Sequence, residues 1–344
     1  MAKRLPAEWE PQTAVLLTWP HAQGAWGQEY HHVETVFIAV AKAIANSGQT
    51  VLITAYDMQH QEDILNKLAS HQVNMNFIQS YLAPSNDIWA RDHGPITCMN
   101  EKTAIQCDFK FNAWGKKYDY EFDDAIPSAL FKSQLLKGYL AEKIDFVLEG
   151  GSIETDGQGT LLTTTQCLGN PHRNSNLSLV ELEQYLHEYL GFDHFLWLSE
   201  GKMLGDDTDC HIDTLARFIN PNTIAYVHCD DPNDPHYKPL LAMKNQLEAL
   251  RNKEHQPYQL VPLPLPSPHF DGKGNHLPAT YANFLITNQL VLVPLYQDKL
   301  DSAVLEIFQH HFPEREIIGI DCRALIEQYG SLHCMTMQIP QVLR

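Results

Sequence analysis

The sequence has no run of apolar residues long enough to cross a bilayer, which takes about 20 consecutive positions. Its first residues carry a little positive charge but no apolar stretch behind it, so they do not resemble a secretory signal peptide. We therefore expect a cytoplasmic protein that makes no use of a membrane.

Cysteine pairs at metal-binding spacing are also missing. The seven cysteines are scattered, and no Cys-x-x-Cys occurs. This pattern argues against a four-cysteine zinc site and against a disulfide framework. We expect most of the cysteines to be small buried residues, any one of which could be a nucleophile.

Basic residues are scarce compared with acidic ones. Lys and Arg number 24 against 42 Asp and Glu, which gives a formal net charge of −18. A surface of this charge repels phosphate backbones, so we expect no nucleic-acid partner, whereas small cations are attracted. Hydrophobic residues at 44% and charged residues at 19% are typical of a globular chain.

Strand-like and helix-like patterns alternate along all 344 residues, without a long linker, a low-complexity tract or an exact repeat. We therefore predict a mixed α/β fold in a single domain, residues 1–344. Four alternate prolines predict an extended surface segment over 262–268, because prolines cannot sit in a central strand. Predicted strands are 14–19, 51–56, a half-buried 105–111, 223–229 and a hairpin of 284–287 with 290–296. Predicted helices are 33–44, 64–68, one from Ser178 to Gly191 with a capping box to Glu181, and a short one that Asp321 caps and that runs into Tyr329.

Two segments combine carboxylates with turn residues. Residues 86–95 end in Gly-Pro, and Trp89 and Asp92 can converge there only from a turn. Residues 148–152 place Glu149 after an apolar stretch and before two glycines, which permit close approach of backbone or ligand. Each segment alone is equally typical of an ordinary turn.

Two later segments add a histidine, another carboxylate and a cysteine. Half of residues 206–213 are aspartates, and the segment includes His211 and Asp213, which share one face if it is extended. The acidic run could also bind calcium, but it lacks EF-hand spacing. Residues 330–336 contain Cys334, and a lone cysteine is more often inert than catalytic. Together the four segments supply a thiol, an imidazole and three carboxylates, a set suited to nucleophilic chemistry.

In this order, the segments resemble the agmatine deiminase family of the guanidine-modifying (pentein) superfamily, which is related to the peptidylarginine deiminases. The resemblance runs from about residue 5 to residue 340, and several collinear motifs are far more specific than one. The matching motifs are Pro6–Glu10, Trp89–Pro95, Glu149–Ser152, Thr208–Phe218, Leu277–Asn283 and His333–Thr336. The sequence departs from the family at Cys210, where Gly is usual, and at Gly330-Ser331-Leu332, where Gly-Gly-Asn is favoured. These departures bear on the substrate tail and not on the reaction type.

The resemblance implies a five-bladed α/β propeller with pseudo-fivefold symmetry and a site on its axis. It implies a hydrolase acting on C–N bonds of linear amidines, which converts agmatine and water to N-carbamoylputrescine and ammonia in putrescine biosynthesis. No cofactor is implied, and the partner is a small cationic guanidino substrate, with a homo-oligomer possible. A deiminase of free or peptidyl arginine stays open, because Arg91, Arg173 or Arg217 could hold an α-carboxylate. A non-catalytic cation-binding protein of the same fold is the other alternative.

The resemblance also assigns catalytic roles. Cys334 attacks as a thiolate and forms an amidino-cysteine, His211 transfers the protons, and Glu149 orients His211. The nearby carboxylates oppose thiolate formation in the empty site, so the substrate's charge is expected to help create the nucleophile. No metal is expected, although His211, Asp213 and Cys334 are also zinc-type ligands.

The substrate-binding residues follow from the same resemblance. Asp92 and Asp213 accept paired N–H bonds from the planar guanidinium. Trp89 covers the cation with its π-face. Asp87 and Asp207, together with Trp89, are the predicted neighbours of the substrate's primary amine.

Overall fold

The computed structural model describes residues 3–100, 103–175 and 177–342, so the outermost residues of the predicted domain 1–344 lie outside this description. Five of its sheets share one connectivity: an antiparallel strand pair, then a crossover helix, then a strand parallel to the second. The first four units, each with its helix, are β4 (Ile96–Met99), β5 (Ala104–Lys110), α5 (Ile126–Ser133) and β6 (Tyr139–Val147); β7 (Glu154–Thr155), β8 (Thr160–Thr164), α8 (Leu179–Leu190) and β9 (His194–Leu198); β10 (Ala216–Asn220), β11 (Thr223–His228), α9 (Tyr237–Ala249) and β12 (Gln259–Pro264); β15 (Leu285–Ile286), β16 (Leu290–Leu295), α10 (Asp301–His311) and β17 (Glu316–Asp321).

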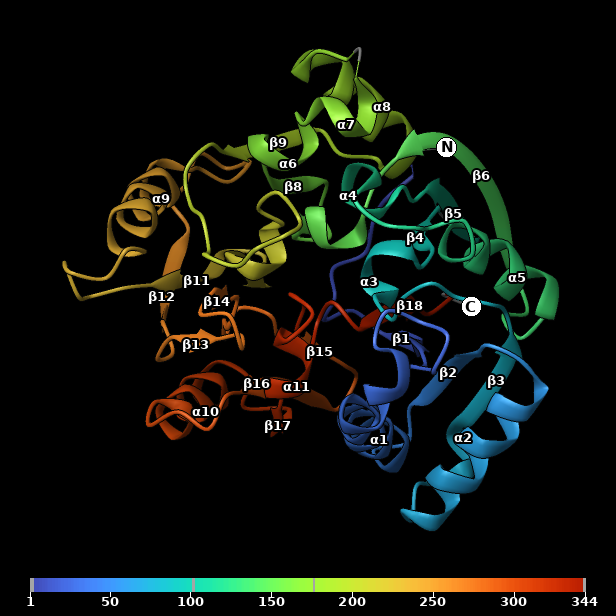
Figure 1. Ribbon diagram of the computed structural model, residues 1–344. Coiled ribbons are helices and arrows are strands. Elements are labelled where there is room, and N and C mark those ends of the chain that lie inside the picture. Colours follow the sequence, from blue (N-terminus) through green and yellow to red (C-terminus); the bar gives the residue numbers. More distant parts are fainter. Residues whose placement is uncertain (1–2, 101–102, 176, 343–344) are drawn as a thin grey trace.

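The fifth unit is assembled from both ends of the chain. Strand β18 (Thr336–Pro340) pairs antiparallel with β1 (Gln12–Thr18), and α1 (Tyr30–Asn46) leads from β1 to the parallel β2 (Thr50–Ala55). Helix α2 (Met58–Ser70) then adds β3 (Ile78–Leu82) at the edge. Figure 1 shows the five sheets around a common centre, with α1, α5, α8, α9 and α10 on the outside. A sixth, two-stranded sheet consists of β13 (His269–Phe270) and β14 (His276–Leu277).

The mixed α/β prediction and most of its elements are confirmed. The predicted strands at 14–19, 51–56 and 223–229 correspond to β1, β2 and β11, and the predicted hairpin to β15 and β16. Helix α1 buries the predicted face, and α8 begins at the predicted Ser178–Glu181 capping box and ends before Gly191. None of the helices in the described parts of the chain is long and apolar enough to cross a membrane.

Two local predictions were wrong. Strand β5 is almost fully buried and not half-buried, because its polar residues Gln106 and Asp108 are buried as well as the apolar ones between them. The short helix near the C-terminus, α11 (Arg323–Ile326), stops before Tyr329, although the Asp321 carboxylate does accept the N–H of Arg323.

The prolines lie in an extended segment, as predicted, because Pro262 and Pro264 belong to β12, an edge strand that pairs with β11. Gln259 and Leu265 donate their N–H groups toward the β11 side, to Asn222 and His228. In a strand, successive N–H groups point to opposite sides, so the backbone nitrogens of the even-numbered prolines face the unpaired edge of the sheet. Proline has no N–H group, and no hydrogen bond is lost on that side.

Candidate active site

All predicted site residues lie in the connections that lead from the last strand of one unit to the first strand of the next. The connection 83–95 carries Asp87, Trp89 and Asp92, and the connection 148–153 carries Glu149. Figure 1 shows α3 (Ala90–His93), in the first of these, near the common centre. The other two connections involved are 199–215, with Asp207, His211 and Asp213, and 322–335, with Cys334. Residues distant in sequence therefore converge because successive units turn inward at equivalent points.

Five of the predicted residues line one pocket. Its cavity volume is about 50 Å³, and the pocket opens to solvent. No lysine or arginine is among the described residues that line it, so its wall is acidic and aromatic. The pocket is lined by Ala25, Asp87, Trp89, Asp92, Trp114, Tyr118, Asp207, Thr208, Gln328, Tyr329, Gly330 and Cys334.

Asp92 is held on both of its carboxylate oxygens. Oδ1 accepts the backbone N–H of Gly151 at 3.1 Å, and Oδ2 accepts the Nε1–H of Trp114 at 3.0 Å. Burial raises the pKa of Asp92 to about 6, although the nearby His211 opposes this shift. The carboxylate is thus fixed in place and still ionised at neutral pH.

Trp114 was not predicted from the sequence. It lies in an unusual run in which all four residues from 113 to 116 have positive φ, with φ 55° at Trp114 itself. Non-glycine residues in this conformation are strained, and such strain is often kept where a side chain has a functional position. Here the strained turn aims the indole N–H at Asp92. The Asn-Ala-Trp-Gly sequence gave no periodic signal for it.

His211 and Asp213 meet the site by a route other than the predicted one. The segment is not extended: Ile212–Thr214 is a 3₁₀ turn that begins directly after His211. Both side chains nonetheless reach the centre. His211 Nδ1 lies 3.6 Å from Asp92 Oδ1, and Asp213 Oδ2 lies 3.9 Å from Cys334 Sγ. One turn of a tight helix brings these two side chains together as effectively as a strand would have done.

Gly151 lies where three functional groups converge. A Cβ added there would come within 2.6 Å of His211 Nδ1, 2.8 Å of Asp92 Oδ1 and 3.1 Å of Asp213 Oδ2. These separations are below van der Waals contact, so any side chain would displace the imidazole or the carboxylates.

Gly151→Ala is therefore expected to lower kcat/KM about 100-fold, the scale expected for a displacement of roughly 1 Å at an active site. Gly272→Ala is the matched control, because a Cβ at Gly272 meets no atom within 4 Å. Steady-state kinetics of both purified variants would check this, and equal activities would contradict the packing argument.

Cys334 lies at the buried end of the pocket, in the turn before β18. Its thiol contacts Asn283 Oδ1 at 3.4 Å, and its backbone N–H is 3.3 Å from the same oxygen. Burial raises the pKa of Cys334 well above its ordinary value, and the charges of Asp213 and Asp92 raise it further. The thiol is therefore protonated in the empty site.

Asn283 is a residue whose position the sequence did not reveal, although the Leu277–Asn283 motif was noted. It lies in the fourth connection, 265–284, the one that carries no predicted site residue. Its Oδ1 accepts the N–H of His333 at 2.8 Å, and its Nδ2 donates to the carbonyl of Asp213 at 3.3 Å. Asn283 thus ties together the backbone around Cys334 and Asp213. Two backbone N–H donors fix Oδ1, so the thiol of Cys334 faces a carbonyl oxygen whose position is set.

Glu149 is fully buried beside His211. Its oxygens accept from Nε of Arg173 at 2.8 and 3.1 Å, and Arg173 also binds Asp209 at 2.7 Å. Both ring nitrogens of His211 are without a hydrogen-bond partner among the described residues. The predicted orientation of His211 by Glu149 therefore shows no direct hydrogen bond here, and Arg173 fixes the carboxylate.

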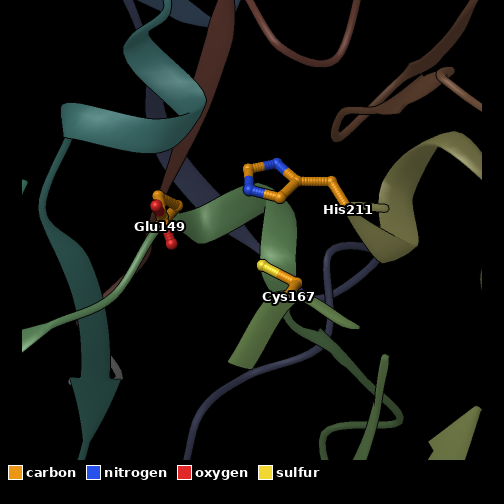
Figure 2. Close-up of side chains that lie close together, drawn as sticks. All are labelled: Glu149, Cys167 and His211. Atoms are coloured by element: carbon orange, nitrogen blue, oxygen red, sulfur yellow. The ribbon is translucent and has the colours of Figure 1, made fainter. Parts of the chain in front are cut away.

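Figure 2 shows the side chains of Glu149, Cys167 and His211 close together. Their possible ligand atoms all lie within 4.8 Å of one another. These three residue types fit a soft divalent cation in principle. The Arg173 guanidinium on Glu149 places a positive charge beside that position, which disfavours a second cation there. The zinc-type set considered from the sequence, His211 with Asp213 and Cys334, shares only the histidine with this cluster.

The two remaining acidic residues flank the pocket. Asp87 accepts the N–H of Ile88 at 2.8 Å, and burial raises its pKa to about 7. Asp207 accepts the hydroxyl of Tyr118 at 2.6 Å and lies 3.4 Å from the Lys117 ammonium. Both carboxylates can therefore offer oxygen acceptors to a cationic ligand tail.

Comparisons with known proteins agree over almost the whole chain. A family model described as Porphyromonas-type peptidyl-arginine deiminase matches residues 4–340. A curated protein of Marinomonas sp. named "Putative agmatine deiminase" is 34% identical, covering 98% of this chain and 94% of that one. The solved "Putative Arginine Deiminase from Porphyromonas gingivalis" has a TM-score of 0.92 at 45% identity, covering 98% of both chains. The agmatine deiminase of C. jejuni with substrate bound has a TM-score of 0.91 at 36% identity, covering 100% of this chain and 98% of that one.

Proposed function

Because the chain belongs to the Porphyromonas-type peptidyl-arginine deiminase family, we propose that it is an agmatine deiminase, a hydrolase of C–N bonds. It converts agmatine and water to N-carbamoylputrescine and ammonia, a step in making putrescine. The observation that carries this proposal is the pocket: a cysteine at its buried end, carboxylates along it, and an acidic outer part. Agmatine has a guanidinium at one end and an ammonium at the other, which matches both ends of the pocket.

The charge of the pocket favours agmatine over free arginine. Arginine carries an α-carboxylate, which needs a cation beside it. The arginines considered from the sequence are all engaged elsewhere: Arg91 and Arg217 with Glu8, and Arg173 with Glu149. Lys117 is held by Asp207 and Asp209. An α-carboxylate would therefore meet Asp87, Asp92 and Asp207 and no lysine or arginine among the described residues that line the pocket.

The first half of the proposed reaction forms the covalent intermediate. Asp92 and Asp213 hold the guanidinium, and Trp89 covers its face. The thiol of Cys334 gives its proton to His211, and the thiolate forms a C–S bond to the guanidinium carbon. His211 passes that proton to one terminal NH₂ group, whose C–N bond breaks as ammonia leaves. A positively charged amidino-cysteine remains.

The second half consumes water. His211 takes a proton from a water molecule, and the hydroxide adds to the amidino carbon. The C–S bond then breaks, the hydroxyl proton passes to sulfur, and the urea group of N-carbamoylputrescine is released. The proton on His211 leaves with ammonia as ammonium. Glu149, fixed by Arg173, stabilises the charged imidazole electrostatically.

The proposal extends to the architecture. The five sheets of equal connectivity are the blades of a five-bladed α/β propeller, and the five connections that meet at its axis build the site. The antiparallel pairing of β18 with β1 supports this, because it completes the fifth unit from both chain ends. One domain, a cytoplasmic location and independence from cofactors complete the proposed description.

Product identification tests the proposed activity. The protein would be incubated separately with agmatine, free arginine and a peptide containing arginine, and ammonia and the ureido product would be measured. Agmatine is expected to be consumed with by far the largest kcat/KM. Faster turnover of arginine or of the peptide would contradict the substrate assignment, and no turnover of any of them would favour a non-catalytic binding protein.

Asp207→Asn tests the amine end of the pocket. Removing one carboxylate charge is expected to raise KM for agmatine about tenfold, or about 1.4 kcal/mol, while kcat changes little. Butylguanidine, which lacks the amine, is expected to be unaffected by the substitution. Asp230→Asn is the matched control, because Asp230 is highly exposed and lies outside the pocket. Equal effects on both substrates would remove Asp207 from the tail site.

A further inference from the structure

A buried chain of charged groups runs from the site to the N-terminal segment. His333 lies directly before Cys334 and is almost completely buried. Its Nδ1 lies 2.8 Å from Asp213 Oδ2, and its Nε2 lies 2.7 Å from Glu8 Oε2. Glu8 is itself bound by Arg91 at 3.3 Å and by Arg217 at 3.1 Å. The imidazole is therefore held between two carboxylates.

The two contacts of His333 fix its protonation. Carboxylate oxygens only accept hydrogen bonds, so a ring that contacts one at each nitrogen must carry both protons. The His333 imidazole, the Arg217 guanidinium and other cations keep the pKa of Glu8 and of Asp213 below their ordinary values, although burial alone would raise both. The geometry places both protons on His333, between the two carboxylates, although burial and the guanidiniums of Arg217 and Arg91 lower the pKa of this imidazole.

The consequence for Asp213 is geometric. Its Oδ2 is anchored by His333, whereas its Oδ1 has no hydrogen-bond partner among the described residues. A fully buried carboxylate oxygen without a donor is unfavourable. A guanidinium N–H would supply the missing donor, and the anchor at Oδ2 determines where Oδ1 lies.

We propose that Glu8 and His333 are positioning residues, which hold Asp213 ionised and leave its Oδ1 as the acceptor for a planar guanidinium or amidinium cation. This inference rests on the proposed function, which supplies the guanidinium substrate. It concerns two residues that take no part in the steps of the proposed reaction. The charged groups that face the chain come from several elements. They are Arg91, Asp92, Glu149, Glu154, His211, Arg217 and Cys334.

The test compares two electrophiles that both alkylate Cys334. Chloroacetamidine carries the planar cation that Asp213 would hold, and iodoacetamide is neutral, so the ratio of their rates reports amidinium binding. His333→Gln is expected to lower this ratio about tenfold. It is also expected to move the acid limb of the ratio to higher pH by about one unit, because Asp213 loses a neighbouring cation. Glu8→Gln, which keeps an acceptor but removes its charge, should act in the same direction.

Glu154→Gln is the matched control. Glu154 pairs with Arg217 at 2.6 Å in the same buried cluster but does not contact His333. An unchanged acid limb in both His333→Gln and Glu8→Gln, or an equal change in Glu154→Gln, would overturn the inference. The ratio of alkylation rates is measured without substrate turnover. A protein that does not hydrolyse agmatine would therefore refute the proposed function, and the positioning role of Glu8 and His333 would still be tested.

If the variants do not fold, ¹⁵N NMR of the histidine rings in the unaltered protein tests the same inference, because it reports which ring nitrogens carry protons. A buried ring with a proton on each nitrogen at pH 7 is expected for His333, because each nitrogen contacts a carboxylate oxygen. A spectrum in which all buried rings are neutral at pH 7 would overturn the proposal.

Discussion

Cys334→Ser is expected to abolish agmatine hydrolysis, with a fall in kcat of about 10⁴-fold or more. A serine hydroxyl is much less acidic than a thiol, and the Cys334 environment already opposes ionisation through burial and the charges of Asp213 and Asp92. A serine there would have no means of becoming a nucleophile. Substrate binding should persist, because the carboxylates and Trp89 are untouched.

Mass spectrometry of trapped turnover provides the matching positive result. Acid quenching of the unaltered enzyme during turnover is expected to leave an amidino adduct on Cys334. Cys229→Ser is the control, because Cys229 is another free buried cysteine and lies outside the pocket. Full activity in Cys334→Ser, or an adduct on another cysteine, would end the proposed mechanism.

The sequence predicted most elements, because burial patterns and capping residues are local. Helix α1 follows from the spacing of Val33, Phe37 and Ile44, and α8 from its capping box. The extended conformation of 262–268 was predicted from its prolines, but its pairing with β11 was not, because nothing local shows that a strand will lie at an edge.

For the site, the sequence predicted the residues proposed for chemistry but not the residues that position them. The residues proposed to carry the chemistry stand in recognisable motifs, and the structure brings Cys334, Asp92 and Asp213 together. The residues that hold them do not stand out: Asn283 and Arg173 act through contacts across the centre. The connections between units have no periodic pattern of apolar residues. Which residues their side chains contact can therefore be inferred only from the repeated topology of the units. Four of the five connections carry a predicted site residue, and the fourth carries none. Once the repeated units are known, this difference indicates that the fourth connection also supplies a residue, which is Asn283.

Asp213→Asn is expected to change two reactions of the site in opposite directions. Hydrolysis of agmatine should fall about 10³-fold, because the guanidinium loses a charged acceptor, and the charge developing in the transition state loses its partner. Alkylation of Cys334 by neutral iodoacetamide should become about tenfold faster near neutral pH. The reason is that removing a negative charge 3.9 Å from the sulfur lowers the pKa of the thiol, and one pKa unit is a factor of ten in thiolate.

The opposite signs make this prediction specific to electrostatics. A variant that was simply damaged would lose turnover without gaining thiol reactivity at neutral pH. Rates would be measured against pH, with peptide mapping to assign alkylation to Cys334 among the seven buried cysteines. Asp108→Asn is the control, since Asp108 is a buried carboxylate that binds Ser128 and lies outside the pocket.

The same pH series decides whether the substrate creates its own nucleophile. In the unaltered protein, an inert amine that occupies the tail end of the pocket is expected to lower the alkylation pKa of Cys334. It adds a positive charge to a site in which Asp92 and Asp213 outweigh the cations near the sulfur. In Asp213→Asn this response should be smaller, because part of the opposing charge is already gone. An alkylation pKa that does not move with the amine would show that Cys334 ionises independently of its substrate.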